Sequence, residues 1–264
     1  MDITSEKKFD RRSFPQNRLK ANLKAGKVQI GAFVTAPCPE VVEVLGATGF
    51  DFVILDTEHT ASGIETVVDM MRAAEIYGMS PVVRVPDDTP KNIARYLDVG
   101  AYGVQVPMVH TADQARAIVR AMKYPPEGER GMSGGRGPRW GLIENYRQTS
   151  NEEALVAVMC ESVEGLKNID EIVRVPGVDT VFIGAFDLSQ SLGLPGQTTH
   201  PIVEDAIKTI LDACKRAEVI PGIVAPSLEL TRKRIEQGFL YVTTFDDMAF
   251  FADAAAKRLD EIRS

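Results

Sequence analysis

The sequence is poor in cysteine and has no long apolar run, and each scarcity argues against a class of protein. Only three cysteines occur, Cys38, Cys160 and Cys214, and no two of them form a CxxC pair. Neither a disulfide framework nor a cysteine-based zinc site is indicated, and a reducing cytoplasm is the expected location. No apolar run approaches the ~18 residues of a membrane span. The charged N-terminus also lacks the apolar segment of a signal peptide.

Clustered positive charge is also missing. The formal net charge is -7, with 30 Lys and Arg against 37 Asp and Glu. Binding to nucleic acid or to an anionic membrane draws its favourable free energy from clustered Lys and Arg. We therefore expect no nucleic-acid or membrane partner, and a small molecule is the expected ligand.

What the chain does have is a regular alternation of short β-rich runs with segments of helical periodicity. Near-continuous apolar strands are typical of a parallel sheet covered on both faces. Eight units in one 264-residue domain predict an α/β fold, a closed (β/α)8 TIM barrel, with an open doubly wound sheet as the alternative. A short helix ending at Gly26 precedes the first strand. The predicted strands span residues 29–35, 51–56, 80–85, 103–108, 155–161, 179–184, 220–225 and 239–244.

Two segments fall outside this alternation. Residues 1–15 are expected to form a flexible N-terminal arm. Residues 124–153 form a long Gly-, Pro- and Arg-rich connection before the fifth strand, and loops of such length are often functional. Its arginines are either solvated or part of a mobile lid over a carboxylated substrate. The arginines in question are Arg130, Arg136 and Arg139.

Polar side chains gather where the predicted strands end, which is where barrel enzymes carry their active sites. Any one of them could be a helix N-cap or part of a rim salt bridge. Caps and rim salt bridges are a less convincing explanation when four strands end in such residues. The residues are Asp56, Glu58, His59, Arg84, Glu161 and Asp187.

Glu161 and Asp187 follow neighbouring strands, and adjacent strands are ~5 Å apart. Two converging carboxylates repel each other unless a cation lies between them. Oxygen ligands favour a hard divalent ion, so Mg²⁺ or Mn²⁺ is expected. Cys160 is not expected to be a ligand, because strand alternation turns it to the opposite, helix-covered face.

Several motifs across nearly the whole chain, from about residue 18 onward, together resemble the HpcH/HpaI family of metal-dependent (class II) pyruvate aldolases. This family includes 4-hydroxy-2-oxoheptanedioate and 2-keto-3-deoxy sugar-acid aldolases. The motifs that carry the resemblance are TGFDFVILDTEH, PVVRV, LDVGAYGVQVPMV, KYPPEGERG, the glutamate of VMCES, and VFIGAFDLSQSLG.

The resemblance implies reversible retro-aldol cleavage of a 4-hydroxy-2-oxo acid to pyruvate and an aldehyde, through a metal-stabilised pyruvate enolate. It implies that Glu161 and Asp187 bind the metal, for which Co²⁺ or Zn²⁺ are further options, and that Arg84 binds the keto-acid oxygens. His59 with Asp56 would transfer protons. The backbone N–H groups of Gly184 and Ala185 would receive the pyruvate carboxylate. A homo-oligomer, a hexamer, that exchanges the C-terminal helix between subunits is also implied.

The chain departs from the family at two positions. Met159 stands where many relatives have glutamine, and Phe186 gives GAFDLS where GPADLS is common. Both changes concern the shape of the pocket, and therefore the substrate.

There are four alternatives to a metal-dependent aldolase, and two of them are disfavoured. A Schiff-base aldolase needs a lysine on a strand, and none of the eight runs contains one. A citrate-lyase-like or malyl-CoA-like carbon–carbon lyase and a non-catalytic keto-acid-binding barrel stay open. The G-x-S-x-G match at residues 131–135 lacks the strand–turn–helix context of a hydrolase. His110 and His200 adjoin predicted helix starts, where a structural role is expected.

Overall fold

The computed structural model describes residues 16–264 and forms a closed barrel of eight parallel strands, paired in sequence order. Closure is completed by the pairing of β1 with β8. The barrel is confirmed, and the open-sheet alternative is excluded. The strands are β1 (Gln29–Val34), β2 (Phe52–Asp56), β3 (Ser80–Arg84), β4 (Gly103–Val106), β5 (Leu155–Cys160), β6 (Thr180–Ile183), β7 (Ile220–Val224) and β8 (Tyr241–Asp246).

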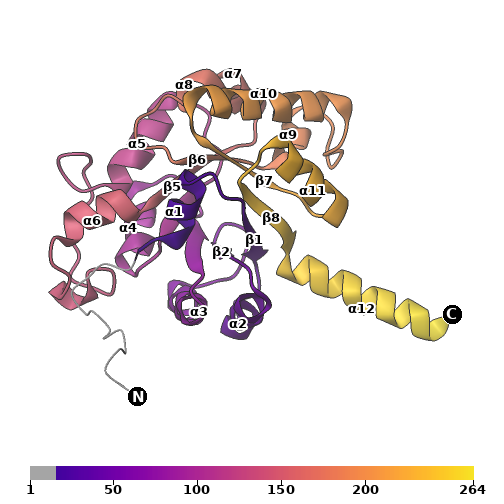
Figure 1. Cartoon of the computed structure of the whole chain (residues 1–264), viewed down its shortest axis with the longest axis horizontal. Helices are drawn as coiled ribbons and strands as arrows, with labels where there is room; N and C mark the ends of the chain where they lie inside the picture. The colour runs from indigo at the N-terminus through magenta and orange to yellow at the C-terminus, as the bar shows by residue number, and fades with distance from the viewer. Residues whose placement is uncertain (1–15) are drawn as a thin grey trace, which may run out of the picture.

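Helices surround the strands in the order expected for a (β/α)8 fold (Figure 1). Many begin at residues suited to a helix start: Thr111 and Gln114 form a capping box, and Pro39, Pro90 and Pro201 occupy first-turn positions. The helices are α1 (Arg18–Lys24), α2 (Pro39–Thr48), α3 (Ile64–Ile76), α4 (Pro90–Asp98), α5 (Ala112–Met122), α6 (Tyr146–Glu153), α7 (Val163–Lys167), α8 (Ile169–Ile172), α9 (Ala185–Ser191), α10 (Pro201–Ala217), α11 (Leu228–Gln237) and α12 (Asp247–Arg263), with a 3-10 turn, η2 (Arg139–Gly141).

The strands separate two hydrophobic clusters. The larger one lies between the outer strand faces and the helices and includes Cys160, which confirms that this thiol faces away from the barrel interior. The smaller one fills the barrel interior with Phe33, Met159 and Phe182 among others. Because the interior is packed with side chains, a substrate can reach only the ends of the barrel.

Helix α1 covers the N-terminal end of the barrel. Leu19 and Leu23 belong to the interior cluster. The side-chain amide of Asn17 donates to the carbonyls of Tyr102 and Glu153, just before β4 and β5. The predicted arm at residues 1–15 lies outside the described residues. Since this end is closed, the carboxyl ends of the strands form the mouth.

Helix α12 extends away from the barrel (Figure 1). The Asp247 carboxylate at its base accepts hydrogen bonds from the backbone N–H groups of Thr35 and Ala36. Phe250 and Phe251 are exposed, as are Leu259 and Ile262 further along. These apolar side chains therefore do not seal the barrel of their own chain. Between residues 16 and 264, no helix combines the length and apolar character that crossing a membrane requires.

Candidate active site

A buried ion pair lies at the mouth between β2 and β3. Asp56 and Arg84 are register partners on these strands, two residues after Ile54 and Val82 of the interior cluster, so both side chains point into the barrel. The Arg84 Nε atom donates to Asp56 Oδ1 at 2.8 Å. The guanidinium also lies over the Phe33 ring, 4.8 Å from its centroid. The Asp56 side chain is fully buried and that of Arg84 is 12% exposed, so the pair holds the guanidinium in one orientation.

Glu58 connects this pair to His59. Its Oε2 atom lies 3.3 Å from Arg84 Nη1 and 3.6 Å from His59 Nε2. Asp56 contacts the backbone of the same turn, because it accepts from the N–H groups of Glu58 and His59 at 3.0 and 3.4 Å. The carboxylate nearest the His59 ring therefore belongs to Glu58, while Asp56 orients the turn that carries the ring. Burial, the largest effect, raises the pKa of Glu58 despite the nearby Arg84 charge.

Glu161 is the most perturbed carboxyl group at the mouth. Its Oε1 atom accepts the backbone N–H of Met108 at 2.7 Å, whereas its buried Oε2 has no hydrogen-bond partner within residues 16–264. Burial, followed by the charges of Asp187 and Glu58, raises its pKa to about 7. An ionised Glu161 would be stabilised by a cation at Oε2, since burial and its acidic neighbours both disfavour the negative charge.

Asp187 and Gly184 lie beside Glu161 at the start of α9. Asp187 is in the first turn of this helix, and its charge acts on both Glu161 and Glu58. A Cβ atom on Gly184 would lie 2.1 Å from Glu161 Oε2, so a side chain at this position would displace that carboxylate from where it lies. The donor set is made of oxygens and fits a hard divalent ion.

This donor set is small. No group of three or more His, Cys, Asp or Glu side chains suited to a metal ion occurs in the described part of the chain. Two protein carboxylates leave several positions of a six-coordinate ion for water and substrate oxygens, which is how Mg²⁺ commonly binds. The arrangement therefore suits an ion that contacts the substrate better than a purely structural one.

The structure adds Met108 to the residues identified from sequence. This residue follows β4 with φ of 54°, a left-handed conformation that is uncommon outside glycine. The conformation accompanies the hydrogen bond from its N–H to Glu161. Its side chain is 45% exposed at the mouth. Sequence reasoning missed it because nothing in the run GVQVPM signals a left-handed residue.

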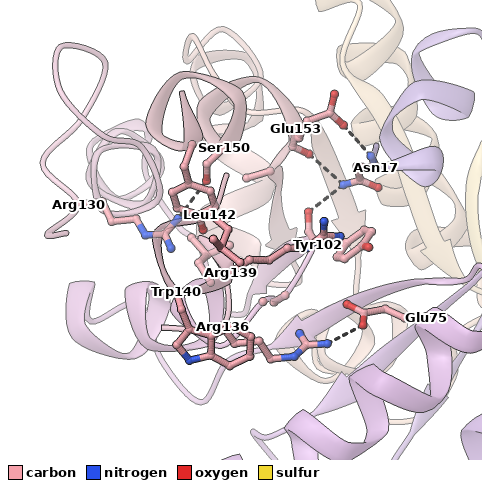
Figure 2. Close-up of a pocket in the computed structure, with 16 residues that line it drawn as sticks. Asn17, Glu75, Tyr102, Arg130, Arg136, Arg139, Trp140, Leu142, Ser150 and Glu153 are labelled. Atoms are coloured by element: carbon pink, nitrogen blue, oxygen red, sulfur yellow. Dashed lines mark hydrogen bonds and ion pairs between the residues drawn. The ribbon is translucent and has the colours of Figure 1, made fainter. Parts of the chain in front are cut away.

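The long segment 124–153 lies away from the mouth. It joins α5 to β5, so it packs at the N-terminal end of the barrel against the connection from α4 to β4. Arg130 pairs with Asp98. Arg136 pairs with Glu75, as Figure 2 shows. The lid hypothesis is therefore wrong for the mouth of the same barrel. The segment also contains η2 and α6, and it lines a pocket of about 560 Å³ with Tyr102 and Trp140 among its walls.

The remaining motifs have structural roles. His110 Nδ1 lies 2.7 Å from Ser162 Oγ. His200 is the N-cap of α10, as its position before a proline predicted. The G-x-S-x-G match follows no strand and is followed only by a short 3-10 turn, so it does not form the strand–turn–helix elbow of a hydrolase.

A closed parallel barrel with a carboxylate pair, an arginine and a histidine at its mouth defines the class as a (β/α)8-barrel enzyme. The family model for HpcH/HpaI aldolase/citrate lyase matches residues 29–253. The chain belongs to this family, and it is an aldolase, that is, a carbon–carbon lyase.

Named relatives agree with this assignment. The 4-hydroxy-2-oxo-heptane-1,7-dioate aldolase of Shigella sonnei is 39% identical over 242 residues, which cover 91% of this chain and 92% of that protein. The 2-keto-3-deoxy-L-rhamnonate aldolase of Escherichia coli O17:K52:H18 is 36% identical, with 94% of each chain covered. A family member from Burkholderia cenocepacia superposes with a TM-score of 0.90 at 33% identity, covering 94% of this chain and 100% of that chain.

Proposed function

We propose that this aldolase reversibly cleaves a 4-hydroxy-2-oxo acid to pyruvate and an aldehyde, and that Glu161 and Asp187 hold a divalent metal ion. The observation that carries the proposal is the buried Glu161 Oε2, which has no hydrogen-bond partner among residues 16–264 and is affected by the charge of Asp187. A metal held there would polarise the keto group as a Lewis acid. The oxygen ligands favour Mg²⁺ or Mn²⁺.

Arg84 stabilises the negative charge that develops on the keto-acid oxygen. Cleavage of the bond between carbons 3 and 4 leaves an electron pair on carbon 3, which delocalises onto that oxygen as an enolate. The guanidinium is held by Asp56 and Glu58 before substrate arrives. A donor fixed in advance needs little reorganisation during the reaction, which is the main source of electrostatic catalysis.

His59 is the group suited to move the proton of the 4-hydroxyl. Its side chain is 65% exposed at the mouth, within reach of substrate, and Glu58 lies beside its Nε2. An imidazole can serve as acid in one direction of the reaction and as base in the other. Asp56 acts as a positioning residue through the backbone of the turn. Recognition of the pyruvate carboxylate by Gly184 and Ala185 stays a prediction from the resemblance.

A Schiff-base mechanism is disfavoured by where the lysines lie. None of the eight described strands contains lysine. Two buried lysines, Lys20 and Lys123, lie at the N-terminal end of the barrel, where their ammonium groups bind the carbonyls of Ala154 and Asn151. Arg84, together with a metal ion if Glu161 and Asp187 hold one, would then supply the positive charge for the reaction.

We further propose that the enzyme works as a homo-oligomer, a hexamer by resemblance, in the cytoplasm. The exposed apolar side chains of α12, with Phe250 and Phe251 near its start, support an exchanged helix. Cys38, Cys160 and Cys214 are all free thiols, which suits a reducing compartment.

The experiment for this proposal measures pyruvate release from 4-hydroxy-2-oxoheptanedioate by enzyme treated with chelator, before and after addition of Mg²⁺ or Mn²⁺. We expect no release without metal and recovery with it. An acyl-CoA thioester of citrate or malate serves as the alternative substrate. Cleavage of the thioester alone would replace the proposal with the citrate-lyase-like reaction.

A further inference from the structure

The loops that the structure describes around the mouth lack lysine and arginine. The connections that follow β1 to β7 contain neither lysine nor arginine. Arg84, at the end of β3, is the cation that the barrel itself brings to the site, and Asp56 and Glu58 already contact it. Acidic residues occur in three of these connections and at the start of the helix that follows a fourth. They include Glu58, Asp87, Glu161 and, in α9, Asp187.

This charge distribution indicates which aldehyde half, the part of the substrate other than pyruvate, the site can bind. The proposed metal and Arg84 account for the oxygens of the pyruvate half. A carboxylate at the far end of an aldehyde would find neither lysine nor arginine in the connections after β1 to β7, and several acidic groups instead. An anion brought close to such a surface without a partner is penalised by both desolvation and repulsion.

Two apolar side chains are exposed next to residues of the proposed metal site. Phe186 is 50% exposed and directly precedes Asp187 in the first turn of α9. Met108 is 45% exposed, and its backbone N–H holds the other side of the Glu161 carboxylate. The two residues flank the proposed metal ligands. Exposed aromatic and thioether side chains beside a reactive centre offer packing surface to an apolar group.

We infer that the aldehyde partner is uncharged and carries an apolar substituent of about the size of an aryl ring, which packs against Phe186 and Met108. The inference rests on the proposed function and names the substrate class for that site. Cleavage of 4-hydroxy-2-oxoheptanedioate, the compound after which the Shigella sonnei relative is named, releases a carboxylated aldehyde. Such an aldehyde is then a poorer substrate for this chain.

The test compares kcat/KM for pyruvate release from two 4-hydroxy-2-oxo acids. One is 4-hydroxy-2-oxo-4-phenylbutanoate, whose aldehyde half is benzaldehyde. The other is 4-hydroxy-2-oxoheptanedioate, whose aldehyde half ends in a carboxylate. We expect the metal-loaded full-length enzyme to prefer the phenyl compound by about ten-fold or more, since one good apolar contact is worth about that factor.

Two variants test whether Phe186 is responsible for the preference for the phenyl compound. Phe186→Ala should reduce the ratio of the two kcat/KM values about ten-fold, equivalent to about 1.4 kcal/mol. Ile76→Ala is the matched control, because Ile76 is a large exposed apolar residue at the end of α3, outside the site. The control should keep the wild-type ratio. An unchanged ratio in Phe186→Ala would overturn the assignment of this residue.

A third readout separates this inference from the proposed function. Exchange of the pyruvate methyl protons with deuterium oxide requires the pyruvate half of the site and no aldehyde. Metal-dependent exchange together with a preference for the heptanedioate would overturn the apolar partner and leave the aldolase proposal intact. Absence of both exchange and cleavage would overturn the aldolase proposal, and this inference with it.

Discussion

Replacement of Arg84 by alanine should affect activity and stability through two separable causes. The side chain stabilises the developing enolate charge, so its loss should lower kcat by on the order of 10²- to 10³-fold. It also neutralises Asp56, whose side chain is fully buried and lies 2.8 Å from Arg84 Nε. Removing one partner of a buried ion pair typically costs about 3–5 kcal/mol, because the remaining charge has no partner. We therefore expect Arg84→Ala to be both inactive and less stable.

A double variant distinguishes the two effects. Arg84→Leu combined with Asp56→Asn removes both charges while keeping side chains of similar size. Since replacement of a buried ion pair by neutral groups is often close to neutral for stability, the free energy of unfolding should return to within about 1–2 kcal/mol of wild type. Activity should stay low.

Chemical denaturation and steady-state release of pyruvate are the two assays. Both are to be run on the single variant, the double variant and Ile76→Ala as the surface control. Near-normal kcat in a folded Arg84→Ala protein would refute the role of the guanidinium. Recovery of activity in the double variant would show that the single change acts only through stability.

Three further predictions concern Glu161, His59 and the enolate. Burial and the charges of Asp187 and Glu58 raise the Glu161 pKa from an ordinary 4.5 to about 7, so the metal-free folded state retains a proton that the unfolded chain releases. The free energy of unfolding should therefore fall by on the order of 3 kcal/mol as the pH rises from 4.5 to about 7. Chemical denaturation at a series of pH values should show this fall in wild type and not in Glu161→Gln. His59→Ala should slow cleavage on the order of 10²-fold with little change in pyruvate affinity, and a collapse of affinity at normal turnover would contradict the proton-transfer role. Borohydride reduction with pyruvate should leave no adduct by mass spectrometry, whereas a modified lysine would indicate a Schiff base.

The barrel could be predicted from sequence because its strands are short apolar runs with helical segments between them. Parallel strands buried on both faces tolerate few polar residues, so Asp56 and Arg84 stand out where a strand ends. Topology then brings the ends of all eight strands to one mouth. For these residues, proximity follows from the fold class alone.

Other features depend on packing that no short motif encodes. The left-handed Met108 and the shared position of Glu58 between Arg84 and His59 arise from how neighbouring loops meet. The lid alternative for residues 124–153 failed for a different reason. Their composition suggested a lid, although a helix-to-strand connection in a barrel lies at the end opposite the active site, and Arg130 is committed there to Asp98.

The measurement that tests the central claim most directly is Mn²⁺ binding by titration calorimetry to chelator-treated protein. Wild type, Glu161→Gln and Asp187→Asn should be compared with Glu171→Gln, a carboxylate in α8 outside the site. We predict one site per chain in wild type and in the Glu171 control, and loss of that site in both Glu161→Gln and Asp187→Asn. Unchanged Mn²⁺ affinity in the two site variants would contradict the claim that Glu161 and Asp187 hold the metal.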